Sequence, residues 1–328
     1  MDNVGAITID VDSTACYHHI HGLDISHQEK DPIYEIALPR FLDAMAELNL
    51  KATLFVIGRD LENPKHQDII AAAAAAGHEI ASHSYAHDYA LSRLPTEKIQ
   101  EDIRQAHVLI QNTTGSSPVG FRAPGYNQSE ALFDAIEDLG YTYDSSFFPT
   151  PTYFAARATA IALYQIRQRQ SRSLIGDVRE FLAPRTPFFP DRNCRFKPAK
   201  DATCARKLIE IPISVASFAR IPWLGTTLTL APDSMGQLMT RSVLKKTTPA
   251  ILELHAIDFA DGHDGFTQAL VNAQNDLNVP IHDKTRRLKS TFEQMAQQRQ
   301  IIPMKSIAQS LKTSLQDSFA YVPQAQAI

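Results

Sequence analysis

Cysteine is scarce in this chain: three occur in 328 residues, and none of them form a CxxC pair. An odd, dispersed set argues against a disulfide framework and a cysteine-rich zinc knot. Thirteen glycines and 19 prolines are too few for a fibrous or low-complexity protein. No run of about 18 apolar residues suits a membrane-spanning helix, and Met1-Asp2-Asn3 lacks the basic start of a signal peptide. We therefore expect a cytoplasmic protein.

A basic excess is also missing. Lys and Arg number 32 against 36 Asp and Glu, a formal net charge of −4. A protein that binds the phosphate backbone is normally basic, so nucleic acid is not an expected partner. Hydrophobic residues make up 44% and charged residues 21% of the chain. These fractions are typical of a soluble globular protein with one large domain or two ordinary ones.

Short apolar runs alternate with helical periodicity along most of the chain. The runs predicted as strands are 6–9, 53–57, 78–81, 119–121, 141–143, 208–213, 250–254 and 301–303. The segments predicted as helices are 35–50, 67–76, 96–110, 129–139, 234–245, 284–298 and 306–317. Repeated βα units imply an α/β fold with a parallel sheet, and seven or eight of them indicate a closed or nearly closed barrel.

The βα rhythm fails between about residues 150 and 206. This stretch holds an expected helix over 154–170 and a loop over 183–190 that is rich in Pro, Phe and Arg. We interpret it as an insertion over one face of the barrel, within a single domain 1–328 whose helical end covers about 304–328. The apolar residues and arginines of 154–172 suit a lid or an oligomer contact. They also suit a peripheral contact with anionic lipid at the inner face of the membrane.

Ionisable residues stand at the ends of the predicted strands. Following the chain, they are Asp10 and Asp12, His83 and His87, Arg122, Asp144, and His255 with Asp258. In a parallel βα barrel, the loops that leave the carboxyl ends of the strands build the active site. We therefore expect these side chains to meet in one pocket.

The spacing of two histidines predicts a metal site. His83 and His87 are four residues apart, so on one side of a helical turn they can share one ion. A carboxylate from Asp10 or Asp12 supplies a third ligand. Such a set leaves coordination positions open, as in catalytic zinc sites. Two carboxylates at the end of an apolar strand also need a counter-charge, which a divalent cation supplies. The set suits Zn, Co, Ni or Fe, of which we expect Zn.

Taken in series, these segments resemble the polysaccharide deacetylases of the NodB-homology type (carbohydrate esterase family 4). The matching segments, in the family's order over about residues 4–260, are Thr8-Ile9-Asp10-Val11-Asp12, Gly77–His87, Phe121–Tyr126, Gly140–Ser146 and Leu254-His255. The resemblance implies a distorted (β/α)7–8 barrel and a metal-dependent amide hydrolase that deacetylates an N-acetyl amino sugar. The alternatives are a non-sugar amide or cyclic imide as substrate, or a catalytically silent glycan- or lipid-binding protein.

The resemblance also implies roles for five residues of this chain. Asp12, His83 and His87 would hold the metal ion. Asp10 would be the general base that takes a proton from water, and His255 the general acid that protonates the leaving amine. Val11 separates the two aspartates where the family usually has an adjacent pair, so the roles of Asp10 and Asp12 are open to exchange.

Further residues are expected to support this chemistry. Arg122 would keep the general base ionised, because a nearby cation lowers a carboxylate pKa. The backbone N–H of Gly125 would help to stabilise the oxyanion. Gly125, Tyr126 and Trp223 are expected to bind substrate, Trp223 as a platform for a sugar ring, although a lone tryptophan is more often packed in a core.

The carboxylate that orients His255 is not evident, because the Asp–Trp pair of the family's usual motif is not recognisable. We favour Asp258 over Asp144 for this role. A cytoplasmic deacetylase does not reach polymer outside the cell, so the expected substrate is an N-acetylated glycan precursor linked to a lipid or a nucleotide.

Overall fold

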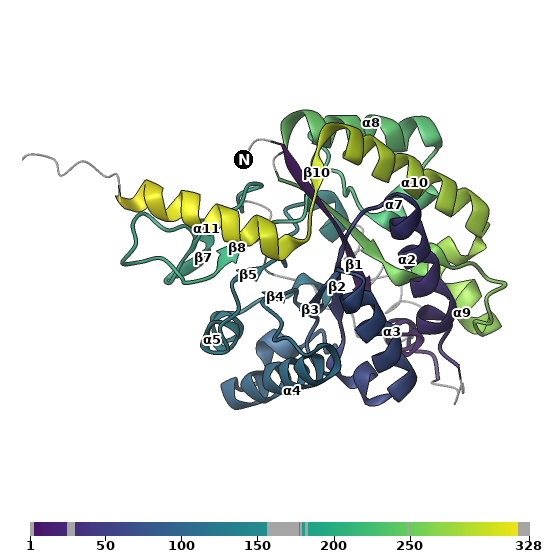
Figure 1. Cartoon of the computed structure of the whole chain (residues 1–328), viewed down its shortest axis with the longest axis horizontal. Coiled ribbons are helices and arrows are strands. Elements are labelled where there is room, and N and C mark those ends of the chain that lie inside the picture. The colour runs from purple at the N-terminus through teal and green to yellow at the C-terminus, as the bar shows by residue number, and fades with distance from the viewer. Residues whose placement is uncertain are drawn as a thin grey trace, which may run out of the picture.

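The computed structural model describes residues 3–24, 30–155, 177, 179–180, 183–247 and 249–320. At its centre is a curled parallel sheet, in which β8, β5, β4, β3, β2, β1 and β9 follow one another and β10 also pairs with β1 (Figure 1). The strands are β1 (Val4–Val11), β2 (Thr53–Val56), β3 (Glu79–Ser82), β4 (Gly120–Phe121), β5 (Tyr143–Asp144), β8 (Ile209–Glu210), β9 (Ala250–His255) and β10 (Gln300–Ile301).

The sheet does not close into a continuous barrel within the described part of the chain, where no ladder joins β8 to β9. The segment after β8 bridges the gap instead. Ser214 N donates to Ile251 O at 3.1 Å, and Leu224 forms a parallel bridge with Glu253. The structure thus confirms the predicted α/β barrel in an open, distorted form.

Helices surround the sheet (Figure 1). They are α1 (Thr14–His21), α2 (Leu38–Glu47), α3 (Pro64–Ala75), α4 (Thr96–Thr114), α5 (Glu130–Asp138), α7 (Gly225–Leu230), α8 (Asp233–Lys246), α9 (Gln268–Ala273), α10 (Ile281–Gln298) and α11 (Met304–Ala320). Local sequence sets several of their ends. Asn63 and Ser129 accept hydrogen bonds from first-turn N–H groups of α3 and α5, and Gly115 ends α4 in the left-handed conformation.

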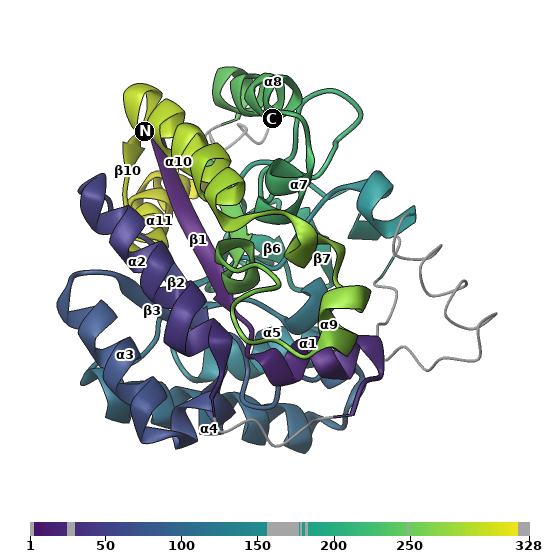
Figure 2. The ribbon, with the colours of Figure 1, turned by 90° about the vertical axis from the view of Figure 1, so that its right-hand side faces the viewer.

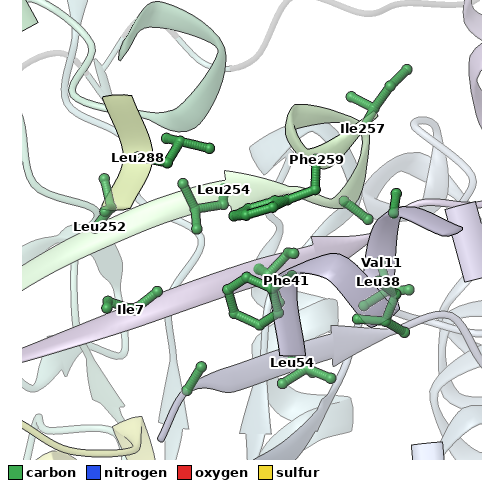
Figure 3. Packing of buried hydrophobic residues seen from close by; sticks show 14 of the residues in the cluster. Ile7, Val11, Leu38, Phe41, Leu54, Leu252, Leu254, Ile257, Phe259 and Leu288 are labelled. Carbon is green, nitrogen blue, oxygen red and sulfur yellow. The ribbon is translucent and has the colours of Figure 1, made fainter. Parts of the chain in front are cut away.

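The alternation of side chains along β1 separates two cores. Ile7, Ile9 and Val11 face outward and pack under α2 and α10, where the rings of Phe41 and Phe259 meet edge to face with centroids 5.3 Å apart (Figure 3). The alternate residues of β1 face the interior of the barrel. Of these, Ala6 lies in an apolar cluster that the first turn of α11 closes, so this helix covers the amino ends of the strands. The carboxyl ends lie at the opposite rim, where Figure 2 shows α1 beside α9.

Part of the predicted insertion forms a hairpin of β6 (Pro190–Asp191) and β7 (Cys194–Pro198). Arg206, which follows it, is buried and pairs with Glu130 and Asp134 of α5 at 2.6 and 2.8 Å. This portion therefore packs against the side of the barrel. Beyond residue 155, the helix expected over 154–170 and the membrane contact expected through 154–172 lie outside the described residues. In the part of the chain that is described, no helix is both long and apolar enough to cross a membrane.

Candidate metal centre and active site

The register of the strands brings candidate site residues from distant parts of the sequence together. In the parallel ladder between β1 and β9, Thr8 lies beside Glu253 and Asp10 beside His255. Alternate residues of a strand share a face, so these four side chains all point into the barrel. His83 follows β3, and its backbone N–H donates to Val56 O of β2 at 2.9 Å. Of the expected strand-end residues, the fold brings the aspartates at the end of β1, the histidines after β3 and His255 to one pocket, whereas Arg122, Asp144 and Asp258 do not line it.

Asp12, His83 and His87 converge on one point and are here called the Asp-His-His triad. Asp12 Oδ1 lies 3.5 Å from His83 Nε2 and 3.3 Å from His87 Nε2, and the two nitrogens are 3.2 Å apart. All three side chains are buried, and Asp12 Oδ1 has no hydrogen-bond partner among the described residues. A buried carboxylate oxygen without a partner is costly, and a bound cation removes that cost.

The protonation states of this triad fit a metal site. Burial lowers the pKa of His87 to about 3 and also lowers the pKa of His83, so both rings are neutral at pH 7. Neutral imidazole is the form that binds a metal ion. His83 Nδ1 lies 2.8 Å from the backbone oxygen of Arg122, which fixes the ring and leaves Nε2 for the ion. The donors suit one divalent cation of the zinc type.

The two histidines do not share a helical turn, so that part of the sequence prediction was wrong. They lie in an irregular loop in which Ser84 and His87 have φ of 66° and 52°. Asp102 of α4 accepts hydrogen bonds from two consecutive backbone N–H groups of the loop, at 2.8 and 3.0 Å. Left-handed residues and this carboxylate, rather than helical spacing, aim both rings at one point.

Asp10 lies beside the triad and is tied to a buried arginine. Its Oδ1 accepts a hydrogen bond from Arg122 Nη1 at 2.6 Å, and its Oδ2 lies 3.7 Å from His83 Nε2. Arg122 is held in turn by Ser145 O at 2.9 Å and Thr8 Oγ1 at 3.1 Å. Burial alone would raise the pKa of Asp10, but the charge of Arg122, followed by the nearby imidazoles, lowers it below its usual value. This carboxylate is ionised at neutral pH.

His255 has the opposite proton affinity to the triad histidines. Burial would lower its pKa, but the negative charges of Glu253, Asp12 and Asp10 raise it to about 9. The ring is therefore protonated at pH 7. An oxygen of Asp10, an oxygen of Glu253 and a ring nitrogen of His255 lie within 4.8 Å of one another. We call these three residues the β1–β9 group.

Neither carboxylate expected to orient the His255 ring does so directly. Asp258 Oδ2 accepts the backbone N–H of His255 at 2.9 Å, and its Oδ1 accepts Thr226 Oγ1 at 3.0 Å, so Asp258 fixes the main chain. Asp144 accepts Ser146 Oγ at 2.7 Å within its own loop. The prediction missed Glu253. Its only sequence signal is its position two residues before His255 on an apolar strand, where the two share a face.

Of the three residues expected to bind substrate, two line the pocket and one is buried away from it. Gly125 and Tyr126 line the pocket, with φ of 57° and 65°, and Tyr126 OH donates to Glu253 Oε1 at 2.6 Å. Trp223 is fully buried in the outer core, and its Nε1 donates to Thr240 Oγ1 at 3.1 Å. A tryptophan without exposed surface offers no platform for a sugar ring, so the prediction for Trp223 was wrong.

The triad, Asp10 and His255 line a pocket of about 840 Å³. Its polar floor includes Asp10, Asp12, His83, His87 and His255. Its walls are mostly apolar and aromatic: Tyr17, Ile20, Tyr89, Tyr126, Tyr153, Ile221, Pro222, Leu224, Leu230 and Ile257. A large apolar pocket with a few convergent ionisable groups is the usual form of a small-molecule site.

Comparison with protein families gives one match. Residues 31–143 match the model described as polysaccharide deacetylase. The matched segment contains His83, His87 and Arg122, whereas the β1 aspartates and His255 lie outside it.

Curated relatives agree with this match over part of their length. A peptidoglycan deacetylase from Helicobacter pylori is 32% identical over 123 residues, which is 36% of this chain and 41% of the relative. A peptidoglycan deacetylase-like protein from Gibberella zeae is 33% identical over 97 residues, 29% of this chain and 28% of the relative. The chain thus matches less than half the length of these relatives.

A solved structure shares the fold over nearly the whole chain. It is a Mycobacterium smegmatis protein provisionally named polysaccharide deacetylase, with a TM-score of 0.58 and 16% sequence identity. The alignment covers 96% of this chain and 92% of that one. At this identity the likeness supports the barrel architecture alone.

Proposed function

We propose that this chain, of which residues 31–143 match the polysaccharide deacetylase model, is a metal-dependent hydrolase that removes the acetyl group from an N-acetyl amino sugar. The observation that carries the proposal is the Asp-His-His triad beside an ionised Asp10 and a protonated His255. Hydrolysis of an unreactive amide needs an electrophilic site, a base and an acid, and this pocket floor offers a candidate for each.

The triad residues would hold the ion, which when bound would polarise the amide carbonyl and ease deprotonation of the attacking water. Asp10 Oδ2, the oxygen that Arg122 Nη1 does not contact, accepts the proton of that water as its oxygen bonds to the carbonyl carbon. His255 then donates its proton to the nitrogen as the C–N bond breaks, and acetate and a free amine leave. Gly125 stays a predicted oxyanion donor, and it lies on the pocket wall.

The finer assignment of substrate is part of the same proposal. The curated relatives are named for peptidoglycan, so an N-acetylated glycan is the substrate class. We favour a lipid-linked glycan precursor, with a nucleotide-linked one as the alternative, because Ile20, Ile221, Leu224 and Leu230 give the pocket an apolar wall. A cytoplasmic site of action, a membrane contact through 154–172 and Zn as the ion, ahead of Co, Ni and Fe, belong to the same proposal.

The test is to measure metal content and acetate release on a panel of N-acetyl amino sugars that are free, nucleotide-linked or lipid-linked. We expect the wild type to bind one ion per chain and to release acetate fastest from the lipid-linked compound. Asp10→Asn should release none. Metal binding without acetate from any sugar would contradict the sugar substrate, and absence of metal would contradict the mechanism.

A further inference from the structure

His255 Nδ1 is buried and has no hydrogen-bond partner among the described residues, and the Asp258 carboxylate does not supply one, because its oxygens accept from the backbone of His255 and from Thr226. Glu253 is fully buried on the same inward face of β9. One of its oxygens lies within 4.8 Å of a His255 ring nitrogen. It is therefore a carboxylate next to the ring that the main chain does not use.

Only one of the two carboxylate oxygens of Glu253 has a hydrogen-bond partner within the described part of the chain. Its Oε1 accepts Tyr126 OH at 2.6 Å, whereas its Oε2 has no hydrogen-bond partner among the described residues. Burial and the neighbouring carboxylate raise the pKa of Tyr126 well above 10, so its phenol is a permanent donor. Tyr126 also has a left-handed backbone, a strained conformation for a non-glycine residue that functional sites tend to retain. Tyr126 thus holds one oxygen and leaves the other to the interior.

The buried charges of this layer pair off. Asp10 is bonded to Arg122, and among the neighbouring charges Glu253 does most to raise the pKa of His255. The other groups whose charges act on His255 or are acted on by it are Asp10 from β1, Asp12 just after β1, His87 from the loop after β3, and Asp258 from the following turn. A buried imidazolium is tolerated only when such a partner is close.

We propose that Glu253, held by Tyr126, is a positioning residue that aims the protonated His255 ring at the leaving nitrogen. The inference rests on the proposed function for its catalytic consequence, but the placement of Glu253 and His255 within 4.8 Å on one face of β9 does not depend on it.

The test compares Glu253→Gln with a matched pair elsewhere in the barrel. Glu79 is also buried, and its Oε1 accepts Tyr143 OH at 2.9 Å, but Thr53 Oγ1 holds its second oxygen at 2.9 Å and it lies in the first position of β3, away from His255. Glu79→Gln is therefore a control for the loss of a buried tyrosine-bonded carboxylate.

We expect Glu253→Gln to lower kcat by about 10- to 100-fold with KM nearly unchanged, as for weakened acid catalysis. The alkaline limb of the rate profile should move down by about one pH unit, because the ring loses a neighbouring negative charge. Tyr126→Phe should shift it in the same direction by less. Glu79→Gln should leave the profile unchanged, whatever it does to stability.

A second readout keeps this inference separate from the proposed function. NMR titration of the His255 ring in the metal-loaded protein should show the same downward shift in Glu253→Gln, even if no acetate is released from any substrate. An unchanged ring titration would overturn the positioning role. Loss of a bound metal ion in Glu253→Gln would also overturn it, by making the carboxylate a metal ligand instead.

Discussion

Two groups of acidic residues and histidines lie at the floor of one pocket, yet the pKa values of their histidines are shifted in opposite directions. In the Asp-His-His triad, burial lowers the pKa of both histidines, to about 3 for His87. In the β1–β9 group, the pKa of His255 is raised to about 9 although burial opposes it. His255 is half-buried and the triad histidines are buried, but burial still opposes the protonated form of His255, so burial does not explain the raised pKa.

The difference follows from the ratio of acids to imidazoles. The triad has two imidazoles for one carboxylate, so each ring lacks a full counter-charge and stays neutral, ready to bind a cation. The β1–β9 group has two carboxylates for one imidazole, so the ring is charged and can donate a proton. Arg122 then balances the remaining carboxylate, Asp10. A one-residue difference in composition therefore separates the proposed metal site from the proposed acid–base pair.

The largest expected effect breaks the triad. His83→Ala should abolish stoichiometric metal binding and lower acetate release at least about 1,000-fold, because several kcal/mol of transition-state stabilisation depend on the ion. Metal analysis and a rate assay check this. His78→Ala is the matched control, since His78 is also buried but accepts a hydrogen bond from Ala52 N at the amino end of β3. Full metal content in His83→Ala would contradict the triad.

The next change breaks the β1–β9 group and spares the triad. Asp10→Asn should lower kcat by about 100- to 10,000-fold, the range for loss of a general base. Metal content should stay at one equivalent, because Asp12 is the carboxylate that meets both triad histidines. Loss of metal in Asp10→Asn with retention in Asp12→Asn would exchange the roles of the two aspartates.

Removal of the cation that balances Asp10 should affect stability as well as rate. Arg122→Met leaves a buried carboxylate without its partner, which costs about 3–5 kcal/mol in the free energy of unfolding. Denaturant titration measures this loss. Arg104→Ala serves as control, because its pair with Glu101 is exposed and we expect no measurable change. Equal stability of the two variants would refute the buried pair as a structural element.

The pH profile sharpens the comparison without any mutation. The rate should fall as pH rises through about 9, where His255 loses the proton that it donates. The folded pKa lies above the ordinary 6.5, so the contribution of this group to stability is complete below pH 6.5 and is lost as pH rises through about 9. Measurements of the rate and of the free energy of unfolding from pH 6 to 10 check the predicted fall in rate and the predicted loss of stability. A rate independent of pH up to 10 would exclude His255 as the acid.

The smallest effect concerns Trp223. Trp223→Phe removes a buried hydrogen bond to Thr240 and some packing, so we expect a loss of about 1 kcal/mol in stability. KM for the glycan should be unchanged, in contrast to the substitution of a pocket residue such as Tyr89→Ala. A tenfold rise in KM for Trp223→Phe would restore it as a sugar platform.

Sequence predicted the parts of the fold that have long, regular patterns. The strands and long helices of the barrel lie within a few residues of their predicted bounds, because periods of 2 and 3.6 persist there. The short helices α1, α7 and α9, of six to eight residues, were missed since one or two turns carry too little periodicity. The β6–β7 hairpin depends on its packing against α5, and no local sequence pattern predicts that packing.

The site likewise contains residues that the sequence predicted and residues that it did not. Residue type and order nominated His83 and His87 with one of two aspartates, the family resemblance selected Asp12, and the fold brings the three together. What a side chain faces could not be read locally. Glu253 meets His255 through strand alternation and Tyr126 through a tertiary contact 127 residues away in sequence. The burial of Trp223 likewise depends on distant helices.

The most direct test of this account is to remove metal from the wild type with a chelator, add Zn stepwise, and follow bound metal and acetate release in one sample. We predict that both rise together and saturate at one ion per chain. The same titration of Asp10→Asn should bind one ion and release no acetate. Acetate release by the metal-free wild type, or full activity in Asp10→Asn, would contradict the division of labour between the triad and the β1–β9 group.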